Sequence, residues 1–404
     1  APRLPGYDHI IIQGKSETPV ALLIEKGKKP EIVDAGNLWG LDTYETDEKI
    51  QEQYGGSESA RIGPAGENLV KYANIFSGTK RVSCNGKTGM GCVMGSKKLK
   101  AVIVKSEGTV PVADQEKFDA IAKEYRTIWG QGGALYAHKE YGSLMLIAQT
   151  GDQTRINNQQ VHISQEQQAH YDIDELVDRY KVGQVSCYQC PVACTQKWKV
   201  PDGDFAGEIS DKLEFGHYTN MGPLLGLFDF PSLVHITDKV NRLGMDCITF
   251  GWIVAMAMEC YQRGILTDKD TGGIKLEWGN VEVISELLEK VARREGFGKL
   301  LAENMPTILS KLPEEASTYG FHTKGLSFSY NCKQGIALSL ATSVATRGAD
   351  HLKGHPFAAM IGLEDMLERI FGKGIPKEML DHASPVAKGR VVWWSENYKM
   401  LMDS

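Results

Sequence analysis

The chain has 404 residues, of which 42% are hydrophobic and 24% charged, and its formal net charge at neutral pH is −6. This balance is typical of a globular protein, and the length indicates two or three domains rather than one. A negative net charge gives no electrostatic basis for binding nucleic acid or an anionic membrane. The longest apolar runs, such as residues 250–258, are too short to span a bilayer.

The cysteines and the chain ends give expectations about the compartment and the completeness of the chain. Eight cysteines in a chain of this length do not indicate a disulfide framework. The sequence does not begin with the charged start and apolar segment that would indicate export. Clustered cysteines fit a reducing interior, so we expect a cytoplasmic protein. The chain opens on Ala1 without methionine and stops on Ser404 inside an expected helix, so we expect both ends to be cut.

Residues 1–112 have the pattern of a β-rich domain. Three short apolar runs separated by glycine, lysine and proline are expected to be strands: 10–12, 21–24 and 102–104. Residues 86–100 are rich in glycine, which lets a backbone approach a ligand and lets successive N–H groups surround a phosphate. The stretch matches neither a P-loop nor a dinucleotide fingerprint, so a tight turn is the ordinary interpretation from the residues alone.

Residues 113–320 have the pattern of a helical domain. Three segments have helical periodicity: 114–130, 173–180 and 283–295. Asp114 is expected to cap the first, and Gly296 to stop the last. Residues 241–249 form a turn that opens an apolar helix. Asp246 is expected at its start, either as an ordinary cap or beside an anionic ligand.

A short loop contains three cysteines, Cys187, Cys190 and Cys194. A tetrahedral zinc site usually combines one Cys-x-x-Cys pair with a second pair or with histidines farther along. Three close cysteines with one distant ligand are more typical of a [4Fe-4S] cluster. Zinc and three unrelated buried thiols are the alternatives. The spacing supplies three ligands, and Cys247 and Cys332 are candidates for the fourth on sequence alone.

A polar segment follows in the last part of the chain. Residues 347–356 contain Arg347, Asp350, His351 and His355. Lysine and glutamate usually dominate a solvated face, so this composition indicates either a structural hydrogen-bond network or a functional site.

Several of these stretches, in the same order, resemble the tungsten-containing aldehyde ferredoxin oxidoreductase family. The segments that carry the resemblance are 62–70, 91–100, 187–194, 243–246, 293–298 and 348–351. The resemblance covers the chain end to end, but only the middle of the family, whose members are longer at both ends. It implies an α+β fold in three domains. These are a β-rich cofactor-base domain (1–112, its N-terminal part missing), a helical domain with the iron–sulfur cysteine loop (113–320) and a truncated C-terminal helical domain (321–404).

The resemblance also implies cofactors: a tungsten (or molybdenum) bis-pyranopterin, a [4Fe-4S] cluster and a magnesium ion bridging the pterin phosphates. Cys187, Cys190 and Cys194 are then cluster ligands, with the fourth beyond residue 404. The implied pterin-binding residues are Lys87, Thr88, Gly89, Asn241, Asp246, Lys353 and Asp403. The family commonly has arginine at the position of Lys87 and aspartate at that of Asn241, whose amide still forms hydrogen bonds.

The catalytic positions distinguish members of the family. In aldehyde-oxidising members a glutamate faces the metal where this chain has Gly216, and His217 follows. Glu208 lies nine residues before His217, a pairing that resembles the active-site subunit of ATP-independent benzoyl-CoA reductases. The resemblance therefore implies His217 as a proton donor with a pKa near the working pH and Glu208 as an assisting carboxylate. His351 matches a histidine of aldehyde-oxidising members and is the third expected catalytic residue.

Three functional hypotheses follow. The first is dearomatising reduction of benzoyl-CoA, and the second is oxidation of aldehydes to carboxylic acids by an aldehyde:ferredoxin oxidoreductase. The third is a structural or electron-relay subunit without tungsten. The expected partners are ferredoxin or a ferredoxin-like electron-transfer subunit and an aromatic CoA thioester or aldehyde substrate. We expect an oligomer, with no nucleic acid and no membrane span.

Overall fold

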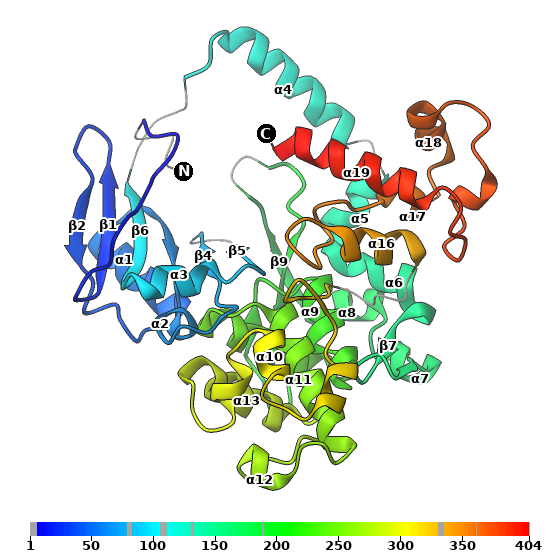
Figure 1. Cartoon of the computed structure of the whole chain (residues 1–404). Helices are drawn as coiled ribbons and strands as arrows, with labels where there is room; N and C mark the ends of the chain where they lie inside the picture. The colour runs from blue at the N-terminus through cyan, green and yellow to red at the C-terminus, as the bar shows by residue number, and fades with distance from the viewer. Residues whose placement is uncertain are drawn as a thin grey trace.

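The computed structural model describes residues 6–78, 83–105, 111–130, 133–187, 190–329, 335–360 and 362–403. It confirms the α+β fold: a six-stranded sheet lies on one side, and a mostly helical remainder lies beside it (Figure 1). Across the described ranges, we find no helix with both the length and the apolarity needed to cross a membrane.

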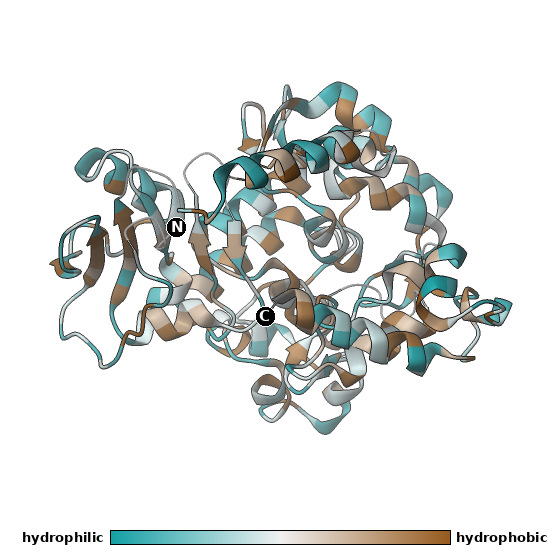
Figure 2. Cartoon of the chain, turned by 90° about the horizontal axis from the view of Figure 1, so that it is seen from above, coloured by the Kyte–Doolittle hydropathy of each residue, from teal (hydrophilic) through white to brown (hydrophobic). Residues whose placement is uncertain are grey.

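The sheet has the strand order β2-β1-β6-β3-β4-β5. Its strands are β1 (Val20–Glu25), β2 (Glu31–Asp34), β3 (Glu58–Arg61), β4 (Ile75–Ser77), β5 (Ser83–Asn85) and β6 (Leu99–Lys105). Strand β1 pairs in parallel with β6, and the other pairs are antiparallel. Figure 2 shows brown, apolar segments within this sheet beside teal, polar ones. Leu23 and Ile103 are buried with Ile50 of α1 (Thr43–Gln53), so that helix covers one face of the sheet.

Two of the three predicted strands are confirmed, since residues 21–24 lie in β1 and residues 102–104 in β6. The predicted strand at residues 10–12 is wrong, because this segment has no strand structure and Ile11 is 85% exposed. Strand β1 already pairs with β2 on one side and β6 on the other. The apolar run at residues 10–12 therefore finds no partner on β1, and a strand without a partner leaves its backbone groups unpaired.

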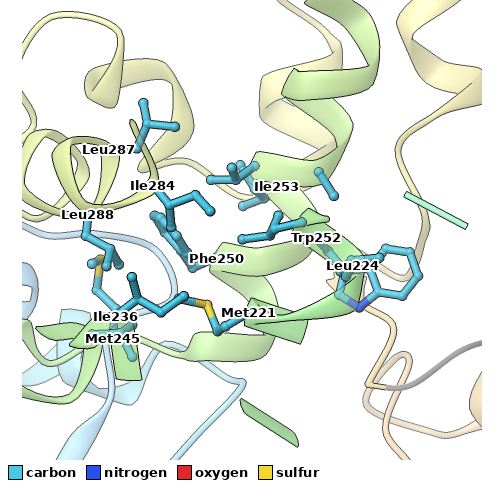
Figure 3. Close-up of a cluster of buried hydrophobic side chains, with 14 of the residues drawn as sticks. Met221, Leu224, Ile236, Met245, Phe250, Trp252, Ile253, Ile284, Leu287 and Leu288 are labelled. Atoms are coloured by element: carbon cyan, nitrogen blue, oxygen red, sulfur yellow. The ribbon is translucent and has the colours of Figure 1, made fainter. Parts of the chain in front are cut away.

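The helical core is built around α11 (Cys247–Gln262), which packs between α9 (Phe215–Met221), α10 (Phe230–Leu243) and α13 (Val281–Arg293). Figure 3 shows Met221, Phe250 and Ile284 meeting in this core. Helix α11 is apolar on all sides, as expected of a helix that is buried all round. Asp246 caps it, as predicted, by accepting a hydrogen bond from the Thr249 N–H.

The other predicted helices are also confirmed, as α4 (Gln115–Gly130), α8 (Ile173–Tyr180) and α13. The predicted stop at Gly296 is wrong, because α13 ends at Arg293 and Arg294 is its left-handed C-cap. Asp114 caps α4 by accepting from the Lys117 N–H at 2.9 Å. The remaining α-helices are α2 (Pro64–Glu67), α3 (Met90–Ser96), α5 (Gly133–Tyr141), α6 (Leu146–Thr150), α7 (Gln165–Ala169), α12 (Asp268–Thr271), α14 (Gly298–Leu301), α15 (Met305–Leu309), α16 (Ile336–Val344), α17 (Phe357–Met360), α18 (Glu364–Phe371) and α19 (Lys388–Asp403). The short strands outside the main sheet are β7 (Arg155–Ile156), β8 (Val161–His162), β9 (Lys181–Val185), β10 (Thr195–Lys199), β11 (Ile209–Ser210), β12 (His322–Thr323) and β13 (Leu326–Ser327).

The segment after β3 joins the sheet to the helical core. Tyr72 is buried among the core residues and donates a hydrogen bond to the Leu301 carbonyl at 2.8 Å. The Lys71 N–H bonds the Ala302 carbonyl at 2.9 Å, and the Asp246 N–H bonds the Tyr72 carbonyl at 3.0 Å. The start of α11 is therefore held at the edge of the sheet, where the candidate site lies.

Candidate functional site

The carboxylate of Asp246 ties the edge of the sheet to helix α11. The chain leaves β5 at Asn85 and turns through Gly86 and Lys87, whose φ is 72°. The Lys87 N–H donates to one oxygen of Asp246 at 2.8 Å, and the Thr249 N–H donates to the other at 2.7 Å. A Cβ on Gly86 would lie 2.8 Å from the carboxylate, so this close approach requires glycine.

The side chain of Lys87 fixes a buried cation at the same place. Its Nζ donates to the Ser327 carbonyl at 3.0 Å and to the Ala349 carbonyl at 2.6 Å. Burial lowers the pKa of Lys87 to about 8, while the nearby charges of Asp246 and Asp350 act in the opposite direction. The ammonium is therefore still protonated at neutral pH, and it links the sheet to residues 347–356.

Residues 347–356 place two histidines near this cation. Arg347 pairs with one oxygen of Asp350, and the other oxygen accepts from the Leu352 N–H at 2.9 Å. The rings of His351 and His355 are 6.2 Å apart and nearly perpendicular. Burial lowers the pKa of His351 to about 3, and the positive charge of Lys87 acts in the same direction. His351 is therefore a neutral imidazole at neutral pH.

His217 lies in the first turn of α9, and its ring is buried. Burial lowers its pKa to about 4, whereas the Glu214 carboxylate and a hydrogen-bonding contact with Asn241 of α10 raise it. The Glu214 N–H donates to His217 Nδ1 at 3.3 Å, and Glu214 is paired with Lys212 at 2.7 Å. The expectation of a pKa near the working pH is wrong for this structure, because burial of the ring outweighs the neighbouring carboxylate.

The carboxylate beside His217 is therefore Glu214 and not Glu208. Both oxygens of Glu208 lie 3.0 Å from Nδ1 of His235 on α10, and the other nitrogen of that ring lies 3.2 Å from Ser285 Oγ. The catalytic role of Glu208 stays a prediction. Glu214 was missed from the sequence, and the structure places it at the N-cap of α9, three residues before His217, in a reciprocal capping-box arrangement.

The three predicted cluster cysteines lie in the loop between β9 and β10. Cys187 is exposed, Cys190 and Cys194 are half-buried, and the Cys190 N–H bonds the Cys187 carbonyl at 3.0 Å. Among the residues that the structure describes, no three histidine, cysteine or carboxylate side chains are grouped as a metal site. Ligation of a cluster by these cysteines stays a prediction, and Cys332 lies outside the described residues.

The base of the cysteine loop lies close to the start of α9. The Cys194 carbonyl would be 2.7 Å from a Cβ on Gly142, the first residue of the 3-10 turn η1 (Gly142–Met145). The next residue, Ser143, accepts a hydrogen bond from the Phe215 N–H at 3.0 Å, where α9 begins. One short turn therefore separates the cysteine loop from the helix that carries His217.

The other predicted cofactor-binding residues differ in position. Thr88 is exposed, and its N–H donates a hydrogen bond to the Gly86 carbonyl at 3.0 Å. Gly89 has a φ of 70°, and a Cβ there would lie 2.1 Å from the Lys71 carbonyl oxygen. Lys353 is half-buried, two residues after His351. The side chain of Asp403 lies outside the described residues, and the roles of all four stay predictions.

Several buried polar atoms, on residues that contact the Lys87–Asp246 turn or helix α9, have no hydrogen-bond partner in the described part of the chain. They are Asn74 Oδ1, Asn241 Nδ2, Thr249 Oγ1, Ser327 Oγ and Ser329 Oγ. Leaving such groups unpaired in a protein interior costs roughly 1–3 kcal/mol each. Their position around a fixed cation and a glycine-rich turn fits a large polar anion, as a pterin cofactor is.

The buried histidines predict a loss of stability in acid. The pKa of His217 is about 4 in the fold and 6.5 ordinarily, so between these values the unfolded chain binds more protons than the folded chain. We expect the free energy of unfolding to fall as the pH decreases from 6.5 to 4, by on the order of 3 kcal/mol for His217 alone.

Urea denaturation of the cofactor-free protein across this pH range measures the effect. His217→Asn should reduce the pH dependence, and the same change at the exposed His170 should leave it unaltered. An equal slope in the His217 variant and the unmodified protein would contradict the prediction.

Known proteins resemble the chain along nearly all its length. The profile of "Aldehyde ferredoxin oxidoreductase, N-terminal domain" matches residues 3–106, and that of "Aldehyde ferredoxin oxidoreductase, domains 2 & 3" matches residues 119–404. The chain belongs to the aldehyde ferredoxin oxidoreductase family. The sequence resemblance to this family is thereby confirmed.

Two members of this family from Pyrococcus furiosus show the range of relatives. The "Tungsten-containing aldehyde ferredoxin oxidoreductase" is 33% identical over 87% of this chain and 58% of its own length. The "Aliphatic sulfonate oxidoreductase, WOR-like subunit" is 32% identical over 86% of this chain and 58% of its own length. The chain therefore spans well under two thirds of the length of these relatives.

A solved structure has the same fold. It is the "Active site complex BamBC of Benzoyl Coenzyme A reductase in complex with 1,5 Dienoyl-CoA", which matches with a TM-score of 0.77 and 22% identity. The match covers 99% of this chain and 65% of the other chain.

Proposed function

We propose that this chain is the active-site part of a tungsten-dependent oxidoreductase that reduces the aromatic ring of benzoyl-CoA. The observation that carries this proposal is the start of α9, where Gly216 precedes the buried His217. A Cβ on Gly216 would meet the Ile248 side chain at 3.8 Å, an ordinary van der Waals contact, so the position would accept a side chain and its absence leaves room there. A planar ring needs this room more than a small aldehyde does.

Cofactor binding in this proposal uses the predicted residues of the site. The predicted residues Lys87, Thr88, Gly89, Asn241, Asp246, Lys353 and Asp403 would hold a bis-pyranopterin carrying tungsten or molybdenum, together with the expected magnesium ion. Cys187, Cys190 and Cys194 would hold a [4Fe-4S] cluster. When bound, these groups supply electrons at low potential.

The side chains of this protein would deliver protons and orient the substrate. Ring reduction consumes protons. Because Nδ1 of His217 accepts from the Glu214 N–H, the neutral ring carries its proton on Nε2, and this is the proton that His217 would deliver. Glu214 and Asn241 contact His217 and keep it in one orientation. Because Glu214 raises the His217 pKa, further negative charge bound nearby would raise it toward neutrality. Glu208 and His351 keep their proposed roles as assisting groups.

Oxidation of aldehydes to carboxylic acids is the second candidate, because relatives at 30–34% identity are named tungsten-containing aldehyde ferredoxin oxidoreductases. In this reaction the neutral His351 would accept or pass on a proton. Either activity would use ferredoxin or a ferredoxin-like subunit for electron transfer. We propose an oligomeric assembly because the relative with the same fold is a complex and another relative is named a subunit.

A substrate comparison tests the proposal. The protein, purified with its metal and iron contents measured, is assayed with benzoyl-CoA and low-potential donor, and separately with simple aldehydes and ferredoxin. We expect turnover of benzoyl-CoA and little action on aldehydes. Rapid aldehyde oxidation with no action on the thioester would favour the second candidate. Protein that binds no tungsten or molybdenum would favour a structural or electron-relay subunit.

A further inference from the structure

The segment that contains β9, the cysteine loop and β10 is basic. From residue 179 to residue 201 the sequence contains Arg179, Lys181, Lys197 and Lys199 and no aspartate or glutamate. The whole chain, in contrast, has more acidic than basic residues and a formal net charge of −6. The loop with the predicted cluster cysteines is therefore carried by a basic hairpin in an acidic protein.

Two of the four cations are already paired with carboxylates. Arg179 lies 3.0 Å from an oxygen of Asp202, and Lys181 lies 2.8 Å from an oxygen of Glu140. No ion pair of either lysine on β10 is found within the described ranges. The two lysines of β10 are therefore the charges of this hairpin that are available to a partner.

These two lysines lie on the outer face of the hairpin. Gln196 and Trp198 of β10 are buried, and successive side chains of a strand point to opposite faces, so Lys197 and Lys199 share the other face. Lys199 is exposed and Lys197 is half-buried. Gly183 of β9 lies opposite Lys197, and a Cβ there would meet no atom of the described part within 4 Å. The face is therefore open beside Lys197.

Exposed apolar side chains accompany the two lysines. Ile209 of β11 lies opposite Lys199 and is 41% exposed. Val182, at the irregularity in the pairing of β9 with β10, is 55% exposed. Charges that steer the approach of a partner and apolar residues that become buried are together typical of a protein–protein interface. A small anion would make no use of the apolar residues, so this surface fits an acidic protein.

The same hairpin carries the predicted entry point for electrons. Cys187, at the end of β9, is exposed, and the base of the cysteine loop is one short turn away from α9. Electron transfer between two redox groups slows steeply as their separation grows. A protein that supplies electrons to a cluster in this loop therefore has to dock close to the loop.

We propose that the outer face of the β9–β10 hairpin, with Lys197 and Lys199, is the docking surface for an acidic, ferredoxin-like electron-transfer protein. The inference rests on the proposed function, because it takes the cysteine loop as the cluster site and a ferredoxin-like protein as the electron donor. At each encounter one electron passes from the reduced iron–sulfur centre of the partner, which is oxidised, to the cluster of this chain, which is reduced. No atoms are exchanged. The lysines speed the encounter, and Val182 and Ile209 are buried in the complex.

The test measures reduction of the cluster-containing protein by a reduced acidic ferredoxin in stopped-flow experiments without thioester or aldehyde. The double variant Lys197→Glu/Lys199→Glu should lower the second-order rate at low salt about tenfold or more, because electrostatic steering changes association rates by about 10–1,000-fold. The difference should shrink at high salt, which screens exposed charges. Reduction by methyl viologen, a small cationic donor, should not slow in this variant.

Lys269→Glu is the matched control for the charge change. Lys269 is an exposed lysine on α12, which lies at the other end of the helical core from β9 (Figure 1). This variant should leave the rate with ferredoxin changed less than about twofold. The double variant Lys197→Arg/Lys199→Arg keeps both charges, so it should also keep the rate.

An unchanged rate with ferredoxin in the folded double glutamate variant would overturn the inference. An equal loss in Lys269→Glu would also overturn it, because the overall charge and not this face would then control the encounter. The proposed function fails separately, if ferredoxin reduces the cluster through this face but benzoyl-CoA is never reduced. Protein purified without iron would overturn the cluster assignment, and this inference with it.

Discussion

Replacing His217 with alanine is expected to lower benzoyl-CoA reduction by roughly a hundred- to ten-thousand-fold, the usual cost of removing a general acid. Metal and iron contents should stay unchanged, because no side chain expected to bind the cluster is altered. The ring is buried at the start of α9, directly after Gly216. Steady-state rates and metal analysis of the same preparation measure the effect.

Two glutamates serve as controls for this prediction. Glu214→Gln removes the carboxylate that raises the His217 pKa, so the pH at which the rate falls should shift to a lower value. Glu208→Gln tests the assisting role that the family resemblance implies for Glu208. From the contacts, its effect should be smaller than that of Glu214→Gln, because Glu208 bonds His235. Near-normal turnover in His217→Ala would contradict the proposed proton donor.

Local signals in the sequence predicted the helices well. Asp114 and Asp246 each precede an apolar periodic segment, and both cap the helix that follows. An N-cap depends on hydrogen bonds within one turn, so neighbouring residues are sufficient to predict it. The prediction of a strand at residues 10–12 was wrong, because a strand depends on a partner elsewhere in the chain and neighbouring residues do not reveal whether one is available.

The same distinction applies to the site. The sequence and the family resemblance identified Lys87, Asp246 and His217, and the structure places them around the start of α11. The sequence did not predict that Lys87 donates a hydrogen bond to the Ala349 carbonyl, which lies 262 positions farther along the chain. Nor did it predict that Glu208 turns to His235 on α10. Both pairings depend on how the sheet, the helices and residues 347–356 pack together, and residue spacing carries no information about this.

Replacing Asp246 with alanine is expected to remove the cofactor and to destabilise the fold. The change removes the cap of α11 and leaves the N–H groups of Lys87 and Thr249 without acceptors in the interior. The combined cost in the free energy of unfolding is roughly 3 kcal/mol. The carboxylate also raises the Lys87 pKa, so its loss would weaken the cation available to an anionic cofactor. We expect tungsten and pterin contents to fall at least about tenfold, a fall to which the lost affinity and the lost stability both contribute.

Asp229→Ala separates the loss of a helix cap from the loss of the cofactor. Asp229 caps α10 by accepting from the Ser232 N–H at 2.8 Å, and it contacts neither Lys87 nor Thr249 through a hydrogen bond that the structure describes. Its removal should lower the free energy of unfolding, measured by urea denaturation, by about 1 kcal/mol. Tungsten and pterin contents should stay unchanged. If Asp246→Ala also retained both and remained active, the Lys87–Asp246 pair would serve only to join the sheet to α11. The buried polar atoms around it would then need another ligand to satisfy them.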